Sequence, residues 1–254
     1  MPKKSRLVYI IPTYNEKENI EQMLIEVIGM LNKLKKYNSS ILVVDDNSPD
    51  GTGGIVKKMA KHNRSIFLLN GNKSGLGTAM IRGYKYAIKN LSADIIVTNE
   101  ADFSYSPSRV PLMLKYLQNG NDAVFGSRRV RKDKKDLFIR TVVHWTANTL
   151  FARYVAGIHQ IDDHNSAFKA IRVKGVLDKI DFDIFPRGYA FFNYLTYKVI
   201  KNTPNIVEIY NTYTPRSKGS SKIGLSPNYL KYFLKDTLEY VVTCFKIRNE
   251  KISK

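Results

Sequence analysis

Residues 41–52 read Ile-Leu-Val-Val-Asp-Asp-Asn-Ser-Pro-Asp-Gly-Thr, and this stretch decides the fold. Its apolar run predicts a buried parallel strand that ends at Asp45 and Asp46. Ligands of open α/β sheets bind outside the carboxyl ends of the strands, so both acids are expected to face a ligand. Gly51 is free to adopt a positive φ in the following turn, and Thr52 is able to cap the next helix. Taken alone, these residues leave open a second interpretation, in which the acids only cap a loop.

Strand and helix patterns alternate on both sides of this stretch. Short apolar runs predict further strands, and segments with apolar residues at helical spacing lie between most of them. The strands are expected at residues 7–11, 66–69, 94–98, 122–125 and 206–210, and a further strand is entered from a loop at 161–170. This alternation is typical of an α/β fold with a mostly parallel central sheet flanked by helices.

A second pair of acids follows the strand predicted at residues 94–98. Glu100 and Asp102 are separated by one small residue, Ala101. Ligands of such sheets gather at the carboxyl ends of the strands, so this pair and the pair at the end of the 41–44 strand can converge on one ligand.

Several segments carry features that suit phosphate. The glycine-rich loop 70–78 opens a helix, and helix amino ends attract phosphate, although the loop matches no established phosphate motif. A helix expected over residues 138–155 places Arg140 and His144 one turn apart on the same face. The basic loop 215–222 suits closure over a phosphate group.

The composition favours one large domain with polyanionic partners. The chain has 254 residues, of which 43% are hydrophobic, and this is enough to bury a full core. Its net charge of +19 favours nucleic acid, an acidic membrane face or phosphorylated small molecules. The single cysteine excludes an intrachain disulfide. No signal-peptide region or long uncharged apolar stretch is evident, so a soluble or peripheral protein is expected.

The last part of the chain predicts a long amphipathic helix. Apolar residues recur at helical spacing from Ser226 onward, with lysine and arginine beside the apolar stripe. We therefore expect a main domain at residues 1–225 and a C-terminal helix and tail at 226–254. This helix either packs on the core or lies on a membrane or a protein partner, and its terminal position favours the second interpretation.

Motifs that would be weak singly occur here in a specific order and spacing, and together they resemble the inverting family 2 glycosyltransferases, most closely the dolichyl-phosphate mannose synthases. The resemblance runs from about residue 8 to residue 222. The motifs are Ile-Pro-Thr-Tyr-Asn-Glu at 11–16, Val-Asp-Asp-Asn-Ser-Pro-Asp-Gly-Thr at 44–52, Gly-Leu-Gly at 75–77, Glu-Ala-Asp at 100–102, Gly-Ser-Arg at 126–128 and the basic run from Arg216 to Lys222.

This resemblance implies a GT-A nucleotide-sugar-binding fold and a role for each matching residue. The nucleoside would be held by Pro12, Tyr14, Glu16, Val44 and Asp46. The donor diphosphate and a Mg²⁺ or Mn²⁺ ion would be held at Glu100, Ala101 and Asp102, with metal ligation by Asp102 and Glu100 and further phosphate contacts from Arg216 and Lys222. The acceptor phosphate would be gripped by Arg128 and Arg140, with His144 where relatives have a serine. Glu100 also departs from the family, which usually has aspartate there.

The implied reaction is inverting transfer of mannose from GDP-mannose to dolichyl or another polyprenyl phosphate, at the cytoplasmic face of a membrane. The second pKa of a phosphate monoester is ~6, so the acceptor is mostly dianionic at neutral pH and attacks without a general base. The last helix or a small membrane subunit would supply attachment. The alternatives are a UDP-sugar donor such as UDP-glucose, a catalytically weakened regulatory subunit, or a basic nucleic-acid-binding protein. The last lacks a recognition motif, so no nucleic-acid partner is expected.

Overall fold

The computed structural model describes residues 4–129, 145–212 and 227–252. At its centre lies a seven-stranded sheet with the order β3-β2-β1-β4-β6-β5-β7. Strand β6 is antiparallel to both of its neighbours, β4 and β5, whereas the other strands run parallel. The strands are β1 (Ser5–Thr13), β2 (Tyr37–Asp45), β3 (Ile66–Asn70), β4 (Ile95–Thr98), β5 (Ala123–Arg129), β6 (Lys169–Arg172) and β7 (Ile206–Thr212). The predicted α/β fold with a mostly parallel sheet is therefore confirmed.

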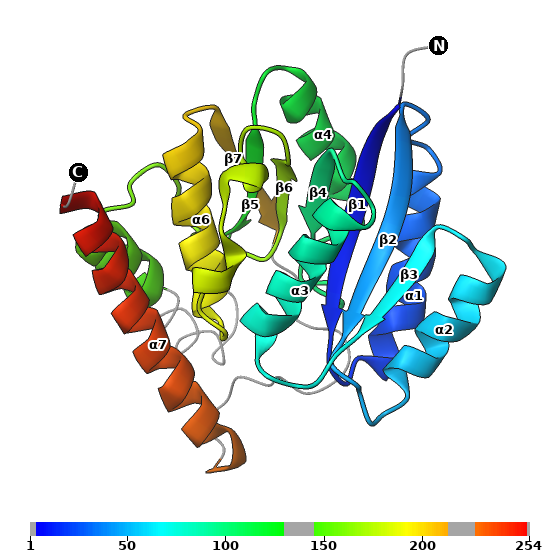
Figure 1. The fold of residues 1–254 in the computed structure, drawn as a ribbon, viewed down its shortest axis with the longest axis horizontal. Helices are drawn as coiled ribbons and strands as arrows, with labels where there is room; N and C mark the ends of the chain where they lie inside the picture. Colours follow the sequence, from blue (N-terminus) through cyan, green and yellow to red (C-terminus); the bar gives the residue numbers. More distant parts are fainter. Residues whose placement is uncertain (1–3, 130–144, 213–226, 253–254) are drawn as a thin grey trace.

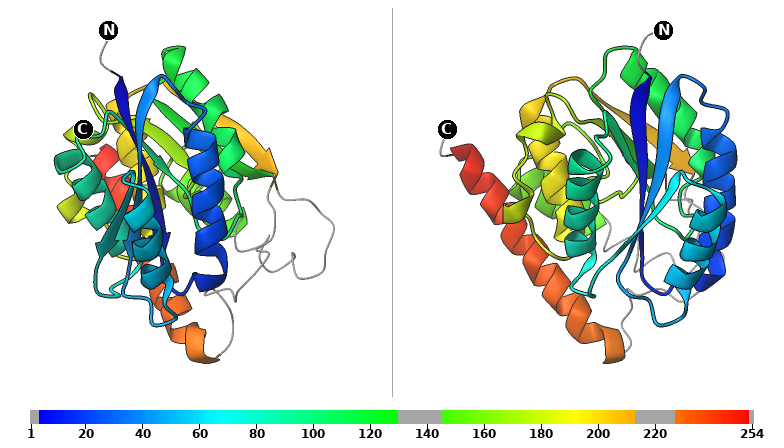
Figure 2. Two further views of the ribbon diagram at one scale, coloured as in Figure 1. Left: turned by 90° about the vertical axis from the view of Figure 1, so that its right-hand side faces the viewer. Right: turned by 45° about the vertical axis from the view of Figure 1, so that its right-hand side comes forward.

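Helices cover both faces of this sheet (Figures 1 and 2). One face carries α1 (Lys17–Leu31), α2 (Thr52–His62) and α4 (Val110–Gln118), and the other carries α3 (Leu76–Lys89), α6 (Ala190–Asn202) and α7 (Pro227–Ile252). Short 3-10 turns lie at η1 (Pro107–Arg109), η3 (Leu177–Lys179) and η4 (Phe182–Ile184).

The sequence of β1 explains why both faces are covered. Leu7, Tyr9 and Ile11 belong to the core on the α1 side, whereas Val8 and Ile10 belong to the core on the α3 side. Successive side chains of a strand point to opposite faces, so a continuous apolar run needs a helical layer on each side. The same alternation places Ile41 and Val43 of β2 in one core and Leu42 and Val44 in the other.

Two further helical segments pack on the α3 side of the sheet. The helix expected at residues 138–155 is described only as η2 (Thr146–Val155), and this segment is a π-helix where a regular α-helix was expected. The predicted C-terminal helix is present as α7, which runs along the outer side of α6 (Figure 1). Across residues 4–129, 145–212 and 227–252, every helix is too short or too polar to cross a membrane.

The strand register brings the predicted motifs to one edge of the sheet. β1 pairs with β2 such that Pro12 lies opposite Val44 and Thr13 lies opposite Asp45. On its other side β1 pairs with β4, with Ile10 opposite Thr98. The loops that carry the two acid pairs therefore leave the sheet on either side of the loop that follows β1.

Candidate functional site

The carboxylate of Asp45, the last residue of β2, binds groups inside the protein. Asp45 is 2% exposed, and its Oδ1 accepts hydrogen bonds from the hydroxyls of Thr13 (2.8 Å) and Ser48 (2.6 Å). Its Oδ2 accepts the backbone N–H of Ser48 at 2.9 Å. The expectation that both acids face a ligand is therefore wrong for Asp45, because its carboxylate fastens the loop after β2 to the end of β1.

The second acid, Asp46, has a different environment. Its Oδ1 accepts a 2.7 Å hydrogen bond from Nη2 of Arg82 on α3, and the two groups form an ion pair. Burial raises the pKa of the Asp46 carboxyl, and the bond from Arg82 opposes that rise. Arg82 was not singled out by the sequence, because a lone arginine on an amphipathic helix carries no local signal.

The loop after β1 carries Tyr14 and Glu16, two of the predicted nucleoside residues. The ring of Tyr14 lies under Nζ of Lys73, which is 3.9 Å from the ring centroid. Glu16 is 5% exposed, and one of its carboxylate oxygens accepts Nδ2 of Asn19 at 3.0 Å. The Tyr14 ring thus lies where the loops after β1 and β3 meet, whereas the Glu16 carboxylate binds the first turn of α1.

The start of α2 differs from the expected cap. Gly51 is the residue before the helix, and its φ of 92° confirms the predicted positive value. Thr52, however, is the first helical residue and makes no side-chain cap. Its hydroxyl instead accepts the backbone N–H of Glu16 at 3.0 Å and donates to Oδ1 of Asp50 at 2.6 Å. Thr52 therefore ties the loop after β1 to the loop after β2.

The turn after β4 carries Glu100 and Asp102, and the buried side-chain amide of Asn99 fixes its backbone. Asn99 is fully buried, and its Nδ2 donates to the Tyr9 hydroxyl (2.9 Å) and to the Tyr105 carbonyl (3.1 Å). Its Oδ1 accepts the backbone N–H of Glu100 at 2.9 Å. Three hydrogen bonds from one rigid side chain therefore fix where the chain leaves β4.

The end of the same turn fixes Asp102. Its Oδ1 accepts the backbone N–H of Ser104 at 3.0 Å. Phe103 between them has a φ of 61°, a left-handed value that costs a bulky residue about 1–3 kcal/mol. Ala101 is 3% exposed and packs in the core on the α1 side. The turn therefore holds two carboxylates in a tight and strained backbone.

The carboxylate oxygens of Glu100 and Asp102 are suitable ligands for a hard divalent cation. Carboxylate oxygens are the ligands that Mg²⁺ and Mn²⁺ prefer, and Mg²⁺ commonly binds through one or two carboxylates together with substrate phosphates and water. Within the described ranges no group of three or more His, Cys, Asp or Glu side chains could hold a metal. Two carboxylates and a substrate phosphate match the ligand set that Mg²⁺ commonly has, and metal binding by Glu100 and Asp102 stays a prediction.

The glycine-rich loop before α3 has a packing role. A Cβ at Gly75 or Gly77 would lie 2.5 Å from the carbonyl oxygen of Arg187 or of Pro186, respectively. The backbone N–H of Thr78, in the first turn of α3, donates to the Arg187 carbonyl at 3.1 Å. Residues 186–188 therefore pack against this helix end, and the attraction of phosphate to it stays a prediction.

The predicted acceptor residues fall largely outside the described ranges. The backbone of Arg128 lies in β5, in register with Asn211 of β7, at the carboxyl end of the strand. Arg140, His144, Arg216 and Lys222 lie outside the described residues. Their roles, and those of Pro12, Tyr14, Glu16, Val44, Asp46, Glu100, Ala101 and Asp102, remain predictions.

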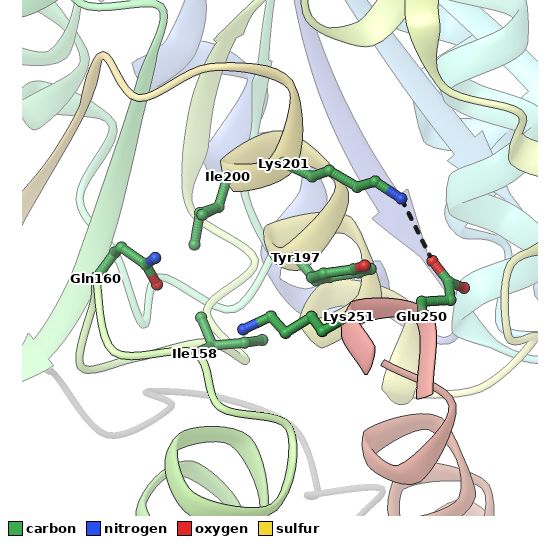
Figure 3. Close-up of a pocket in the computed structure, with 7 residues that line it drawn as sticks. All are labelled: Ile158, Gln160, Tyr197, Ile200, Lys201, Glu250 and Lys251. Carbon is green, nitrogen blue, oxygen red and sulfur yellow. Dashed lines mark ion pairs between the residues drawn. The ribbon is translucent and has the colours of Figure 1, made fainter. Parts of the chain in front are cut away.

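A separate cavity of about 260 Å³ lies between the C-terminal ends of α6 and α7 (Figure 3). Tyr197, Ile200, Lys201, Glu250 and Lys251 line it together with Ile158 and Gln160. The C-terminal end of α6 leads into the start of β7, so this cavity lies at the edge of the sheet opposite to the acid pairs. The cavity therefore takes no part in the candidate site.

Comparison with known proteins gives the family. The model of "Glycosyl transferase family 2" matches residues 9–180. Polyprenol monophosphomannose synthase of Mycolicibacterium smegmatis is 34% identical over 86% of this chain and 81% of its own length. Undecaprenyl-phosphate mannosyltransferase of Micrococcus luteus is also 34% identical, over 86% of this chain and 87% of its own length.

A solved structure supports the fold. Glucosyl-3-phosphoglycerate synthase of Mycobacterium tuberculosis, in complex with Mn²⁺, UDP and glucosyl-3-phosphoglycerate, superposes with a TM-score of 0.65. The match covers 95% of this chain and 80% of that chain at 15% sequence identity, which shows the fold alone. From the family model and the two relatives, the chain belongs to glycosyltransferase family 2.

Proposed function

We propose that this protein transfers mannose from GDP-mannose to a polyprenyl phosphate of the dolichyl or undecaprenyl class, with inversion at the anomeric carbon. The observation that carries this proposal is the 34% identity to two mannosyl-transferring relatives over 86% of the chain. The site is compatible with it, because Glu100 and Asp102 lie at a strand end beside the loops that carry Tyr14 and Asp46.

The reaction needs positioning more than proton transfer. The lipid phosphate is mostly dianionic at neutral pH because its second pKa is about 6, so one of its oxygens attacks the anomeric carbon directly. Glu100 and Asp102 would hold a divalent cation, which would supply positive charge for the departing GDP. Arg128 and Arg140 hold the attacking phosphate on the far side of the sugar, so a single displacement converts an α-linked donor into a β-linked product.

The test is radiolabel transfer into an organic-extractable lipid. Purified protein is incubated with a polyprenyl phosphate and Mg²⁺ or Mn²⁺, and labelled GDP-mannose is compared with labelled UDP-glucose. We expect label in the lipid phase from GDP-mannose only. Label from UDP-glucose alone would replace the donor with a UDP-sugar, and no transfer from either donor would contradict the proposed reaction.

The proposed roles of Arg128 and Arg140 predict a loss that is specific to the acceptor. Arginine suits a phosphate because its forked donors can bind two oxygens at once. Alanine at either position is expected to raise the KM for lipid phosphate or to lower kcat about 10- to 100-fold, since each removes a charge-assisted hydrogen bond. The affinity for GDP, measured by calorimetry, should stay within about twofold of wild type. An equal loss of GDP affinity would assign these residues to the donor.

We assign residues 1–225 to a transferase domain and residues 226–254 to a C-terminal helix with tail. We infer that this helix attaches the protein to the cytoplasmic face of a membrane. Within α7, Tyr240, Cys244 and Ile247 are buried in the core on the α3 side. The opposite face exposes an apolar stripe that repeats about every turn. Its members are Leu234 (58% exposed), Leu238 (65%), Val242 (58%) and Phe245 (48%).

The positive charge beside this apolar stripe favours a lipid surface as the partner that covers it. Lys235, Lys246 and Arg248 are exposed beside it, and the chain carries a net charge of +19. Each basic residue near an anionic bilayer contributes about 1 kcal/mol, and each buried CH₂ contributes about 0.8 kcal/mol. A stripe with these flanks is typical of a helix that lies in the bilayer interface. Phe233 is also expected to contact the membrane, but its side chain lies outside the described part.

Polar substitutions in the stripe are expected to release the protein from membranes. Because α7 also fills the core, its deletion would unfold more than the stripe, so the double variant L238S/V242S is the sharper test. We expect at least a ~10-fold weaker co-sedimentation with phosphatidylglycerol-containing liposomes, with an unchanged melting temperature. The matched control is Ile25→Ser, which alters an exposed apolar residue of α1. If L238S/V242S binds the liposomes as tightly as Ile25→Ser does, another surface of the protein or a separate small membrane subunit provides the attachment.

A further inference from the structure

The short segment before α6, residues 186–188, joins α7 to the start of α3. The backbone N–H groups of Arg187 and Gly188 donate to the two carboxylate oxygens of Glu239 on α7, at 2.9 Å and 2.8 Å. On the other side of the segment, the Arg187 carbonyl accepts the backbone N–H of Thr78 at 3.1 Å. Figure 1 shows the segment between the two helices. Glu239 is therefore connected to α3 through one short stretch of backbone.

The contacts on both sides of this segment are tight. A Cβ added to Gly188 would lie 2.4 Å from a carboxylate oxygen of Asp236 and from one of Glu239. A Cβ added to Gly77, in the first turn of α3, would lie 2.5 Å from the carbonyl oxygen of Pro186. Close-packed groups transmit small shifts, because few voids are present to absorb them. A change at Glu239 is therefore expected to move the start of α3.

The start of α3 continues the loop after β3, which meets the predicted nucleoside residues. The hydroxyl of Thr78 donates to the carbonyl of Ser74 at 3.1 Å, so the first turn of the helix is bonded to the loop. Nζ of Lys73 in the same loop lies 3.9 Å from the centroid of the Tyr14 ring. The position of Lys73 over Tyr14 thus depends on where α3 begins.

We propose that Glu239 is a positioning residue for the donor nucleotide, because its carboxylate places the loop that carries Lys73 through residues 186–188. This inference rests on the proposed function, since it assumes that the nucleotide lies against Tyr14. It goes further by giving α7 a role on the donor side, in addition to the membrane contact of its apolar stripe. The two roles use different side chains, since Glu239 binds residues 186–188 whereas Leu238 is 65% exposed.

A carboxylate suits this position because it accepts both N–H groups at once. Hydrogen bonds to a charged group contribute about 1.5–3 kcal/mol, more than bonds between neutral groups. Two bonds to successive N–H groups also fix the orientation of the backbone, which a single bond would leave free to turn. Glutamine keeps one oxygen acceptor, and its NH₂ group would oppose the other N–H. Glu239→Gln should therefore hold the segment less firmly than wild type and more firmly than Glu239→Ala.

The test is the affinity for GDP, measured by calorimetry on the full chain with Mg²⁺ present. Glu239→Ala is expected to weaken GDP binding at least about fivefold, which is the lower end of the usual coupling between separate sites, and Glu239→Gln should give an intermediate loss. The KM for GDP-mannose should rise in parallel, whereas the KM for lipid phosphate should stay within about twofold of wild type. Gly188→Ala should weaken GDP binding as well, because its Cβ would displace the Glu239 carboxylate.

The matched control is Glu250→Ala on the same helix. The Glu250 carboxylate accepts hydrogen bonds from the Tyr194 hydroxyl (2.6 Å) and from Nζ of Lys198 (2.7 Å), so it fastens α7 to α6 with two bonds of its own. This variant should keep the wild-type affinity for GDP, even if its melting temperature falls as far as that of Glu239→Ala. Equal losses of GDP affinity in the two variants would point to general loosening of α7 and overturn the proposal, and so would an unchanged affinity in Glu239→Ala. A wild-type protein that binds no GDP would instead contradict the proposed function.

Discussion

Replacement of Asp102 by alanine is expected to abolish sugar transfer, with a loss in kcat of at least about 1000-fold. The loss follows from the chemistry of the leaving group, because charge on the departing diphosphate is stabilised by several kcal/mol when a cation is held against it, and ~4 kcal/mol corresponds to ~1000-fold in rate. Asp102 is the shorter acid of the pair, and Ser104 N–H binds its Oδ1 at 3.0 Å. Transfer of labelled mannose and metal-dependent GDP binding should both disappear.

The matched variant is Glu100→Asp. The backbone N–H of Glu100 is held by the buried Asn99, so a shorter side chain at this position leaves the turn intact. Activity is expected to be retained or raised, because Mg²⁺ needs only one or two carboxylates and Asp102 supplies one of them. If the wild-type protein binds no GDP with Mg²⁺ or Mn²⁺, and Asp102→Ala behaves in the same way, then Glu100 marks a site that has lost its activity.

The strands could be predicted because their signal is local. The run at residues 41–44 is apolar without interruption, and a strand that is buried on both faces needs exactly such a run. The end of the strand was also evident, because β2 ends at Asp45, the first of the two acids. The direction of β6 was not evident, because the residues of an antiparallel strand within a mixed sheet are as apolar as those of its parallel neighbours.

The wrong or missing predictions share one cause, which is that they depend on contacts between distant segments. Asp45 and Asp46 are neighbours in sequence, yet one binds Thr13 and the other binds Arg82. Thr52 has the residue type of a helix cap, but its hydroxyl binds Glu16 and Asp50. Local propensity describes what a side chain can do, and the tertiary fold selects among those possibilities.

The difference between the two acids gives a second large effect, on stability. Asp45→Ala is expected to lower the free energy of unfolding by about 3 kcal/mol, because it leaves the Thr13 hydroxyl and the Ser48 N–H without their acceptor in a buried place. For a chain of this size, the melting temperature should fall by about 6–12 °C. Asp45→Asn should destabilise less, because its amide oxygen can accept the Ser48 N–H while its NH₂ group donates to the two hydroxyls, which accept as well as donate. Thermal unfolding followed by circular dichroism measures both changes.

Two controls show that the effect belongs to Asp45. Glu21→Ala removes an exposed acid from α1 and should change stability by less than about 0.5 kcal/mol. Asp46→Ala removes the neighbouring acid, whose partner Arg82 keeps 24% of its side chain exposed and can turn to water. That variant should stay nearly as stable as wild type and lose GDP affinity. If Asp45→Ala unfolds at the wild-type temperature, or if Asp46→Ala is the less stable of the two, the carboxylate of Asp45 does not hold the loop, and the prediction for this loop is wrong.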